Sequence, residues 1–269
     1  MSTGFTRSAS LTVSARVASR AVRVVRWRLL PLVAILTVGA ALRLWLLSRG
    51  VPTLDSDEAV VGLMALHALR GQFSVFFWGQ SYMGSLEALL AAPWLRLLGP
   101  SALTLRLAPM LIGLAFVATV YALGARLYSR LVGLAAAALL AIGPPFFVTL
   151  SVRAYAGYVE TLAVGSGLLL LALDGARPAG RVPWRTALFG LLAGLALWTD
   201  LLVIPYLLGA AAILWWQRRR DLVRQPALPL LVGSTLIGAA PLVIYNVRWG
   251  GVTLFSVLSK TAVGAGGPA

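Results

Sequence analysis

Residues 29–47 read LLPLVAILTVGAALRLWLL, an apolar run with a single charge, Arg43. A helix of about 20 apolar residues is long enough to cross the hydrocarbon core of a bilayer. The 28 residues before this run carry six arginines and no acid, and no small-residue cleavage site closes it. We therefore expect a cytosolic arginine-rich tail, residues 1–28, followed by an uncleaved first membrane helix.

The composition of the whole chain points the same way. Of its 269 residues, 59% are hydrophobic and only 12% are charged, and the mean hydropathy is +0.88. A chain of this composition has too few polar residues to cover the surface of a soluble domain. The sequence predicts an all-α, polytopic transmembrane bundle. The chain has no cysteine, so disulfides and thiolate metal sites are excluded.

Further apolar runs follow the first, and each is a candidate membrane span. Together with the first run they predict about seven spans. The six later segments are 101–124, 131–150, 156–173, 186–200, 201–216 and 226–247.

Charge predicts the orientation of these spans, because cytoplasmic loops collect arginine and lysine. With the amino terminus inside, the cytoplasmic loops are 126–130, 174–185 and 217–225. The tail and these loops hold fifteen arginines against two acids, Asp174 and Asp221. The rest of the chain is nearly neutral. We therefore expect a multi-pass protein of the plasma membrane with its amino terminus in the cytoplasm.

Two segments depart from a plain bundle. The first outer loop, 48–100, contains two helix-like pieces, 59–70 and 82–98, of the kind that lie along a membrane surface. Residues 186–216 reach only about 46 Å as helices, whereas two passes of the bilayer core need about 60 Å. The turn at Thr199 and Asp200 should therefore stop below the outer surface, in a hollow covered by the first loop.

The acids carry the chemical signal, since six of the eight fall on the outer side. They are Asp55, Asp57, Glu58, Glu87, Glu160 and Asp200. The cluster at 55–58 has a simple structural interpretation, in which Asp55 or Asp57 caps the next helix and the carboxylates face water. Glu87, Glu160 and Asp200 lie within or beside apolar segments, where a carboxylate is costly and is usually paired or functional.

Three other residues each allow two interpretations. Arg153 could clamp a phosphate, or it could extend to the membrane surface or pair with Glu160. His67, the lone histidine, is more typical of a satisfied helix residue than of a catalyst. Trp198, beside the recessed turn, fits a membrane-interface anchor or a surface on which a sugar stacks.

Three segments resemble the conserved membrane module of the GT-C glycosyltransferases. The similarity is to bacterial members related to the protein O-mannosyltransferases and the lipid A aminoarabinose transferase, and it covers residues 29–250. In that comparison 251–269 is a C-terminal tail, as in a truncated or minimal member. The segments are Asp57-Glu-Ala-Val-Val-Gly-Leu-Met64, Gly79-Gln-Ser-Tyr-Met-Gly-Ser-Leu-Glu-Ala88 and Gly194-Leu-Ala-Leu-Trp-Thr-Asp200.

The resemblance implies transfer of a sugar from a polyprenyl-phosphate sugar to an acceptor glycan, lipid or protein on the non-cytoplasmic face. Asp57 matches the family's catalytic base and Glu58 its neighbour. A divalent cation held by Asp57, Glu58 or Glu87 is one way to stabilise the departing phosphate, and an outer arginine is another. The residues expected to bind substrate or lipid phosphate are Arg153, Glu87, Tyr82, Gln80, Glu160 and Asp200.

Two alternatives stay open on the sequence. One is a transporter or flippase, although such proteins usually place their sites at the midplane between repeated halves, and the sequence has no evident internal repeat. The other is a non-catalytic, truncated relative. The partners expected are membrane lipids and a lipid-linked sugar, with no nucleic acid.

Overall fold

A computed structural model describes residues 29–174, 183–224, 227–253 and 255. The predicted tail, 1–28, and residues 256–269 lie outside this range. The described residues form helices and no strand, and their β contacts are limited to two isolated bridges. The predicted all-α fold is confirmed.

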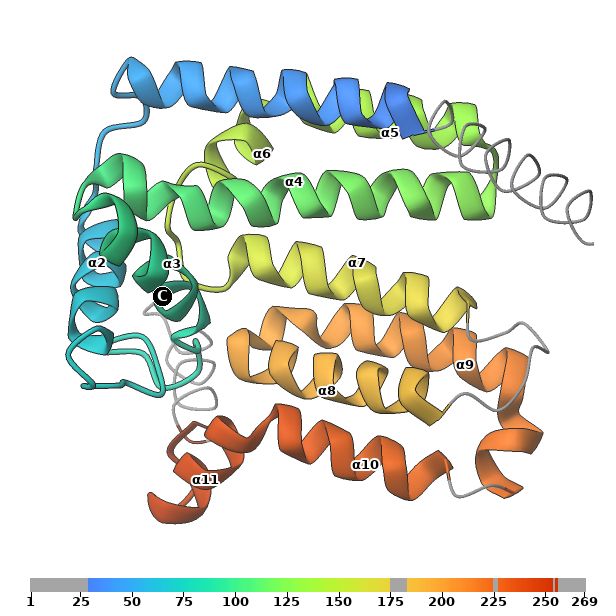
Figure 1. Ribbon diagram of the computed structural model, residues 1–269. Helices are drawn as coiled ribbons and strands as arrows, with labels where there is room; N and C mark the ends of the chain where they lie inside the picture. Colours follow the sequence, from blue (N-terminus) through green and yellow to red (C-terminus); the bar gives the residue numbers. More distant parts are fainter. Residues whose placement is uncertain (1–28, 175–182, 225–226, 254, 256–269) are drawn as a thin grey trace, which may run out of the picture.

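Long helices run side by side through most of the molecule, and two short helices cover one end of them (Figure 1). Helix α4 packs against α5 and α7, α7 packs against α8 and α9, and α8 packs against α10. The long elements are the first helix Leu29–Ser48, α4 Ala102–Leu127, α5 Arg130–Ile142, α7 Tyr158–Asp174, α8 Pro183–Thr199, α9 Ile204–Arg224 and α10 Ala227–Gly238.

Among the described residues, two helices are long and apolar enough to cross a membrane, Leu29–Ser48 and Ala102–Leu127. Helix α10 and the following α11, Ala240–Arg248, would make a third span if they are counted together, although they bend by 71° at their junction. These apolar helices indicate a membrane protein. The count of seven spans is not confirmed, because several of the remaining helices are shorter than a bilayer crossing requires.

The predicted span 131–150 is not one helix. Helix α5 ends at Ile142, and a separate short helix, α6 Pro145–Leu150, follows the Gly143-Pro144 break. Proline lacks the backbone N–H that would continue the helical hydrogen bonds, and its ring clashes with the preceding turn. Arg43 of the first helix contacts this break, because its Nη1 donates to the Ala141 carbonyl at 2.8 Å.

Arg43 is fully buried and has no acidic partner among the described residues. Its guanidinium also donates to the Gly39 carbonyl at 3.0 Å and to Ser151 Oγ at 2.7 Å. A cation that binds the free carbonyls at a helix C-terminus is stabilising. The one charge in the first apolar run therefore joins the first helix to the α5–α6 junction.

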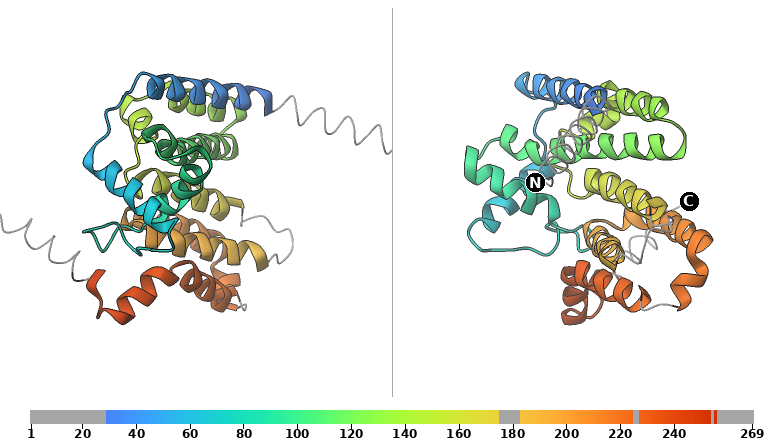
Figure 2. Two further views of the ribbon diagram at one scale, coloured as in Figure 1. Left: turned by 60° about the vertical axis from the view of Figure 1, so that its left-hand side comes forward. Right: turned by 45° about the vertical axis from the view of Figure 1, so that its right-hand side comes forward.

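The two helices predicted in the first loop are confirmed. Helix α2, Ser56–Ala68, begins before the predicted residue 59, and helix α3, Leu86–Leu98, begins after the predicted residue 82. Both cover the same end of the long helices in the two views of Figure 2. A hairpin between them packs on the turn after α8: Gly84 N–H donates to the Thr199 carbonyl at 2.9 Å, and Trp198 Nε1 donates to the Val75 carbonyl at 2.9 Å. The first loop therefore covers the 199–200 turn, as expected.

This contact depends on a glycine. A Cβ at Gly84 would lie 2.4 Å from the Trp198 carbonyl oxygen, so the two backbones could not approach with any larger residue. The chain reverses at Asp200, whose Oδ1 accepts from Leu202 N–H at 2.9 Å, and the 3₁₀ turn Leu201–Val203 leads into α9. A short polar cap thus allows the tight α8–α9 connection.

Candidate functional site

Helix α2 begins in the acidic cluster, and Asp55 is its N-cap. Asp55 Oδ1 accepts a hydrogen bond from Glu58 N–H at 3.0 Å, while its backbone is extended. The capping interpretation of Asp55 is confirmed. Asp57, in the first turn, is exposed, and its side chain makes no hydrogen bond or ion pair with the described part of the chain. Of the cluster, Asp57 is the carboxylate left free toward solvent.

Glu58 points the opposite way, into the protein, and is bound by Arg106 of α4. Arg106 Nε and Nη2 donate to the two carboxylate oxygens at 2.8 and 2.6 Å. Ala154 N–H donates to Glu58 Oε1 at 3.2 Å, and Arg106 Nη1 donates to the Pro52 carbonyl at 2.9 Å. Both side chains are buried. This bidentate pair joins α2 to α4, and the buried Glu58 carboxylate is not accessible to a substrate.

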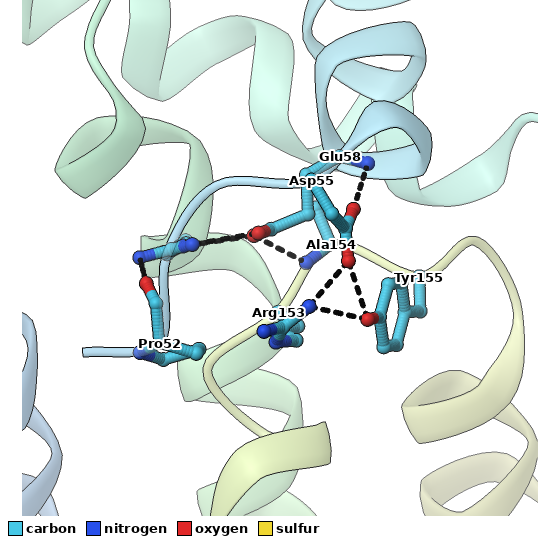
Figure 3. A network of polar contacts seen from close by, with 7 residues as sticks. Pro52, Asp55, Glu58, Arg153, Ala154 and Tyr155 are labelled. Atoms are coloured by element: carbon cyan, nitrogen blue, oxygen red, sulfur yellow. Dashed lines mark hydrogen bonds and ion pairs between the residues drawn. The ribbon is translucent and has the colours of Figure 1, made fainter.

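A second ion pair lies beside it, between Asp55 and Arg153 (Figure 3). Asp55 Oδ2 accepts from both Arg153 Nη1 and the Tyr155 hydroxyl, and Arg153 Nη1 also donates to Tyr155 Oη. Arg153 therefore does not pair with Glu160, one of the two alternatives considered for it. Its Nε is buried and has no hydrogen-bond partner in the described chain.

This pairing changes the acidity of two groups. Burial acts to raise the pKa of Asp55, but the Glu58 N–H and the contacts with Tyr155 and Arg153 outweigh it and lower the pKa below its ordinary value. The hydrogen bond to Asp55, with burial, raises the pKa of Tyr155. At neutral pH Asp55 is an anion and Tyr155 a neutral donor.

Two further carboxyl groups, Glu87 of α3 and Glu160 of α7, are buried, with 1% and 2% of their surface exposed. None of their four carboxyl oxygens has a hydrogen-bond partner among the described residues. Burial, and then the charges of Glu160 and Glu58, raise the pKa of Glu87 well above its usual range. Glu87 therefore holds its proton to unusually high pH.

The outer acids thus come together from separate elements. The charges of Glu58 and Glu160 act on Glu87, and that of Asp200 acts on Glu160. Asp200 also lies against the linker before α7, because a Cβ at Gly157 would be 3.3 Å from its Oδ2. The acids predicted to share one side of the protein lie at one end of the helices.

The candidate metal group is not present. Within the described ranges no three acidic or histidine side chains gather closely enough to hold a metal ion. Asp57, Glu58 and Glu87 fail as a set because Glu58 is bound by Arg106 and Asp57 points to solvent while Glu87 is buried. The three residues therefore form no joint ligand set in the described chain, and a divalent cation at Asp57, Glu58 or Glu87 stays a prediction.

The remaining candidates lie in or near the hairpin between α2 and α3. Gln80 is half-buried in its turn, with its N–H donating to the Phe77 carbonyl at 3.0 Å, and Tyr82 is half-buried against the core between α2 and α3. Trp198 is buried and hydrogen-bonded to Val75, so it cannot stack on a sugar. His67 contacts the Leu63 carbonyl through Nδ1 at 2.8 Å, which agrees with a satisfied helix residue.

Sequence reasoning missed two residues, Arg106 and Tyr155. Arg106 had a visible signal, since it is the only charged residue of the apolar segment 101–124 and such a residue normally has a partner or a function. Tyr155 had none, because a tyrosine in the linker before α7 is unremarkable until Asp55 is seen beside it.

A comparison of the chain with family models, curated proteins and solved structures finds no match in any of the three. The fold itself defines the class as an all-helical membrane protein, with an acidic site at the end covered by α2 and α3.

Proposed function

We propose that this protein is a membrane glycosyltransferase that transfers a sugar from a polyprenyl-phosphate sugar to an acceptor on the non-cytoplasmic face. One observation carries the proposal: six carboxyl groups gather at one end of the helices, and a single member, Asp57, is exposed and unpaired within the described structure. A free carboxylate beside a membrane surface is suited to deprotonate an acceptor hydroxyl.

Inverting transfer needs a base for the acceptor and positive charge for the departing phosphate. Asp57 would serve as the base and would accept the hydroxyl proton as the acceptor oxygen bonds to the anomeric carbon. The bond from that carbon to the phosphate breaks with its electron pair passing to the phosphate oxygen. Arg153, 16% exposed at its side chain, is the nearby cation that could stabilise this charge, because Arg106 is buried and bound by Glu58.

The position of the acids favours this function over transport. A transporter site is expected near the bilayer midplane, between interrupted helices. Here Asp55, Asp57 and Glu58 lie at the start of α2, and Asp200 follows the last residue of α8. With the amino terminus inside and about seven passes, this end is the non-cytoplasmic one, and Asp57 would lie at the membrane surface, where a lipid-linked sugar presents its headgroup.

The test is transfer of labelled sugar from a polyprenyl-phosphate sugar in membranes that contain the wild type or Asp57→Asn. We expect a loss of about 10²-fold or more in the variant, because the general base is removed. Asp221→Asn is the matched control, since it makes the same change on the expected cytoplasmic side, and it should leave transfer unchanged. Equal transfer by wild type and Asp57→Asn would refute the base assignment.

Two further outcomes address the alternatives. A folded wild type without transfer for any donor would favour a non-catalytic relative. Reporter domains inserted at Asp55 and Asp221 should report opposite sides of the membrane, and the same side for both would refute the proposed topology.

A further inference from the structure

The pair formed by Asp55 and Arg153 is incomplete on the arginine side. Arg153 Nη1 and the Tyr155 hydroxyl both donate to one oxygen, Asp55 Oδ2. The second oxygen, Oδ1, accepts from Glu58 N–H at 3.0 Å as the cap of α2. Arg153 therefore contacts one oxygen of Asp55 and not two, and Arg153 Nε stays buried without a partner in the described chain. Arginine normally uses its donors in a fork across two oxygens.

Two donors that converge on one anionic oxygen form an oxyanion site, and here the site is filled by a side chain of the protein itself. The three side chains point toward one another from the N-terminus of α2 and from the linker before α7 (Figure 3). An anion with more oxygens than Asp55 can offer would satisfy the donors better, because it could accept from Nε as well as from Nη1 and Tyr155.

We propose that Arg153 and Tyr155 form the site for the phosphate group of the lipid donor, and that Asp55 occupies this site until the phosphate replaces it. The inference rests on the proposed function, and it adds Tyr155 as a phosphate ligand and Asp55 as an internal competitor. The phosphate offers several oxygens to the two side chains, whereas Asp55 offers one.

The surrounding contacts allow this exchange without unfolding the site. Ala154 N–H is held by Glu58 Oε1 at 3.2 Å, and Glu58 is fixed by Arg106. The backbone beside Arg153 is therefore anchored, and a change of partner requires movement of side chains only. Asp55 accepts from Glu58 N–H through Oδ1, an oxygen that Arg153 does not use, so the cap of α2 does not depend on the Arg153 pair.

Asp55 could have two different effects on phosphate binding, and they predict opposite results when its charge is removed. If Asp55 served to orient Arg153 for the phosphate, neutralising Asp55 would weaken phosphate binding. If Asp55 competes with the phosphate, neutralising it strengthens binding. Asp55→Asn separates the two roles, because asparagine is as good an N-cap as aspartate, while an uncharged NH2 group replaces the anionic Oδ2 that faces Arg153 and Tyr155.

The experiment measures binding of farnesyl phosphate, a short polyprenyl phosphate, to the full-length protein in detergent. We expect Asp55→Asn to bind about tenfold more tightly than the wild type, because the competing anion is gone, and Arg153→Gln about tenfold more weakly, because a charge-assisted hydrogen bond to the phosphate is lost. Tyr155→Phe should weaken binding by a smaller factor. Arg96→Gln, an exposed arginine of α3, is the matched control and should bind as the wild type does.

Farnesol, which lacks the phosphate, distinguishes binding of the phosphate from binding of the isoprenoid tail. The differences in affinity among the variants should vanish with farnesol. Weaker or unchanged farnesyl phosphate binding by a folded Asp55→Asn would overturn the proposal, as would differences that persist with farnesol or an absence of binding by every variant. Thermal unfolding checks that each variant is folded. This measurement does not depend on sugar transfer. If Asp55→Asn binds farnesyl phosphate more tightly but the transfer assay fails, the proposed transferase activity is refuted and the phosphate site is not.

Discussion

Two arginine–carboxylate pairs lie side by side at the start of α2, and they are built differently. Glu58 and Arg106 are buried, form a bidentate contact, and have further backbone partners on both sides. Asp55 and Arg153 are partly exposed, with 31% and 16% of their side-chain surfaces accessible, and they share one carboxylate oxygen with Tyr155. The first pair is closed to any ligand, whereas the second leaves an arginine donor unused.

This difference in burial and hydrogen bonding indicates which ion pair can change partners. Separating Glu58 from Arg106 would leave two buried charges without compensation, which is very unfavourable. Separating Asp55 from Arg153 exposes groups that water or an anion can reach, so its cost is small. Neighbouring residues at the start of α2 therefore differ: Glu58 joins α2 to α4, whereas the side chains of Asp55 and Asp57 remain accessible at the surface.

The largest effect is expected from breaking the closed pair. Arg106→Gln should lower the free energy of unfolding by about 3–5 kcal/mol, because Glu58 is left buried without its cation. Denaturation in detergent, followed by circular dichroism, measures this. The double variant Glu58→Gln/Arg106→Gln should recover part of the loss, since neither charge remains. A single variant as stable as the wild type would show that the pair is not structural.

Glu87 provides a second test, in which the neutral variant gains stability. The pKa of Glu87 is raised in the folded protein, so the folded state loses stability as the pH rises above the ordinary pKa of a glutamate, about 4.3. Glu87→Gln removes this penalty. We expect it to match the wild type near pH 4 and to be more stable by about 1 kcal/mol at pH 8. Thermal melts at both pH values decide this, and a loss of stability at pH 8 would contradict it.

Breaking the open pair should change the stability by less than either of these substitutions does. Arg153→Gln is expected to reduce the free energy of unfolding by less than about 1 kcal/mol, because the pair is partly exposed and water screens it. The same denaturation measurement applies, with Arg96→Gln as the control. A loss as large as that of Arg106→Gln would show that the two pairs are equivalent and would remove the distinction between them.

The smallest effect concerns the pH dependence of Asp55. Its pKa is lowered in the folded protein, so its contribution to stability is present above the ordinary aspartate value of about 3.9 and is lost as the pH falls through the lowered pKa. The wild type should be slightly more stable than Asp55→Asn at pH 6, and the difference should shrink as the pH falls below about 3.9 and through the lowered pKa. A difference that grows on acidification would contradict the assigned shift.

Much of the site could be predicted because its signals are local. An apolar run without charge predicts a helix in a membrane protein, and Asp55 before Ser56 predicts a cap, since both depend on neighbouring residues. The clustering of the acids followed from charge counting alone. The helix breaks at Gly143-Pro144 and at Ala239 were not predicted, because residues 131–150 and 226–247 are each apolar throughout. Hydropathy alone does not account for the effect of proline, which ends a helix.

The sequence by itself determined the helical class, the membrane character and the set of acids available for chemistry, because composition and helix capping act over a few residues. Only the tertiary structure decided which acid is free. Glu58 meets Arg106 48 positions away, and Asp55 meets Arg153 98 positions away. Such pairings depend on how α2, α4 and the linker before α7 pack together. No local pattern in residues 55–58 distinguishes the buried carboxylate from the exposed ones.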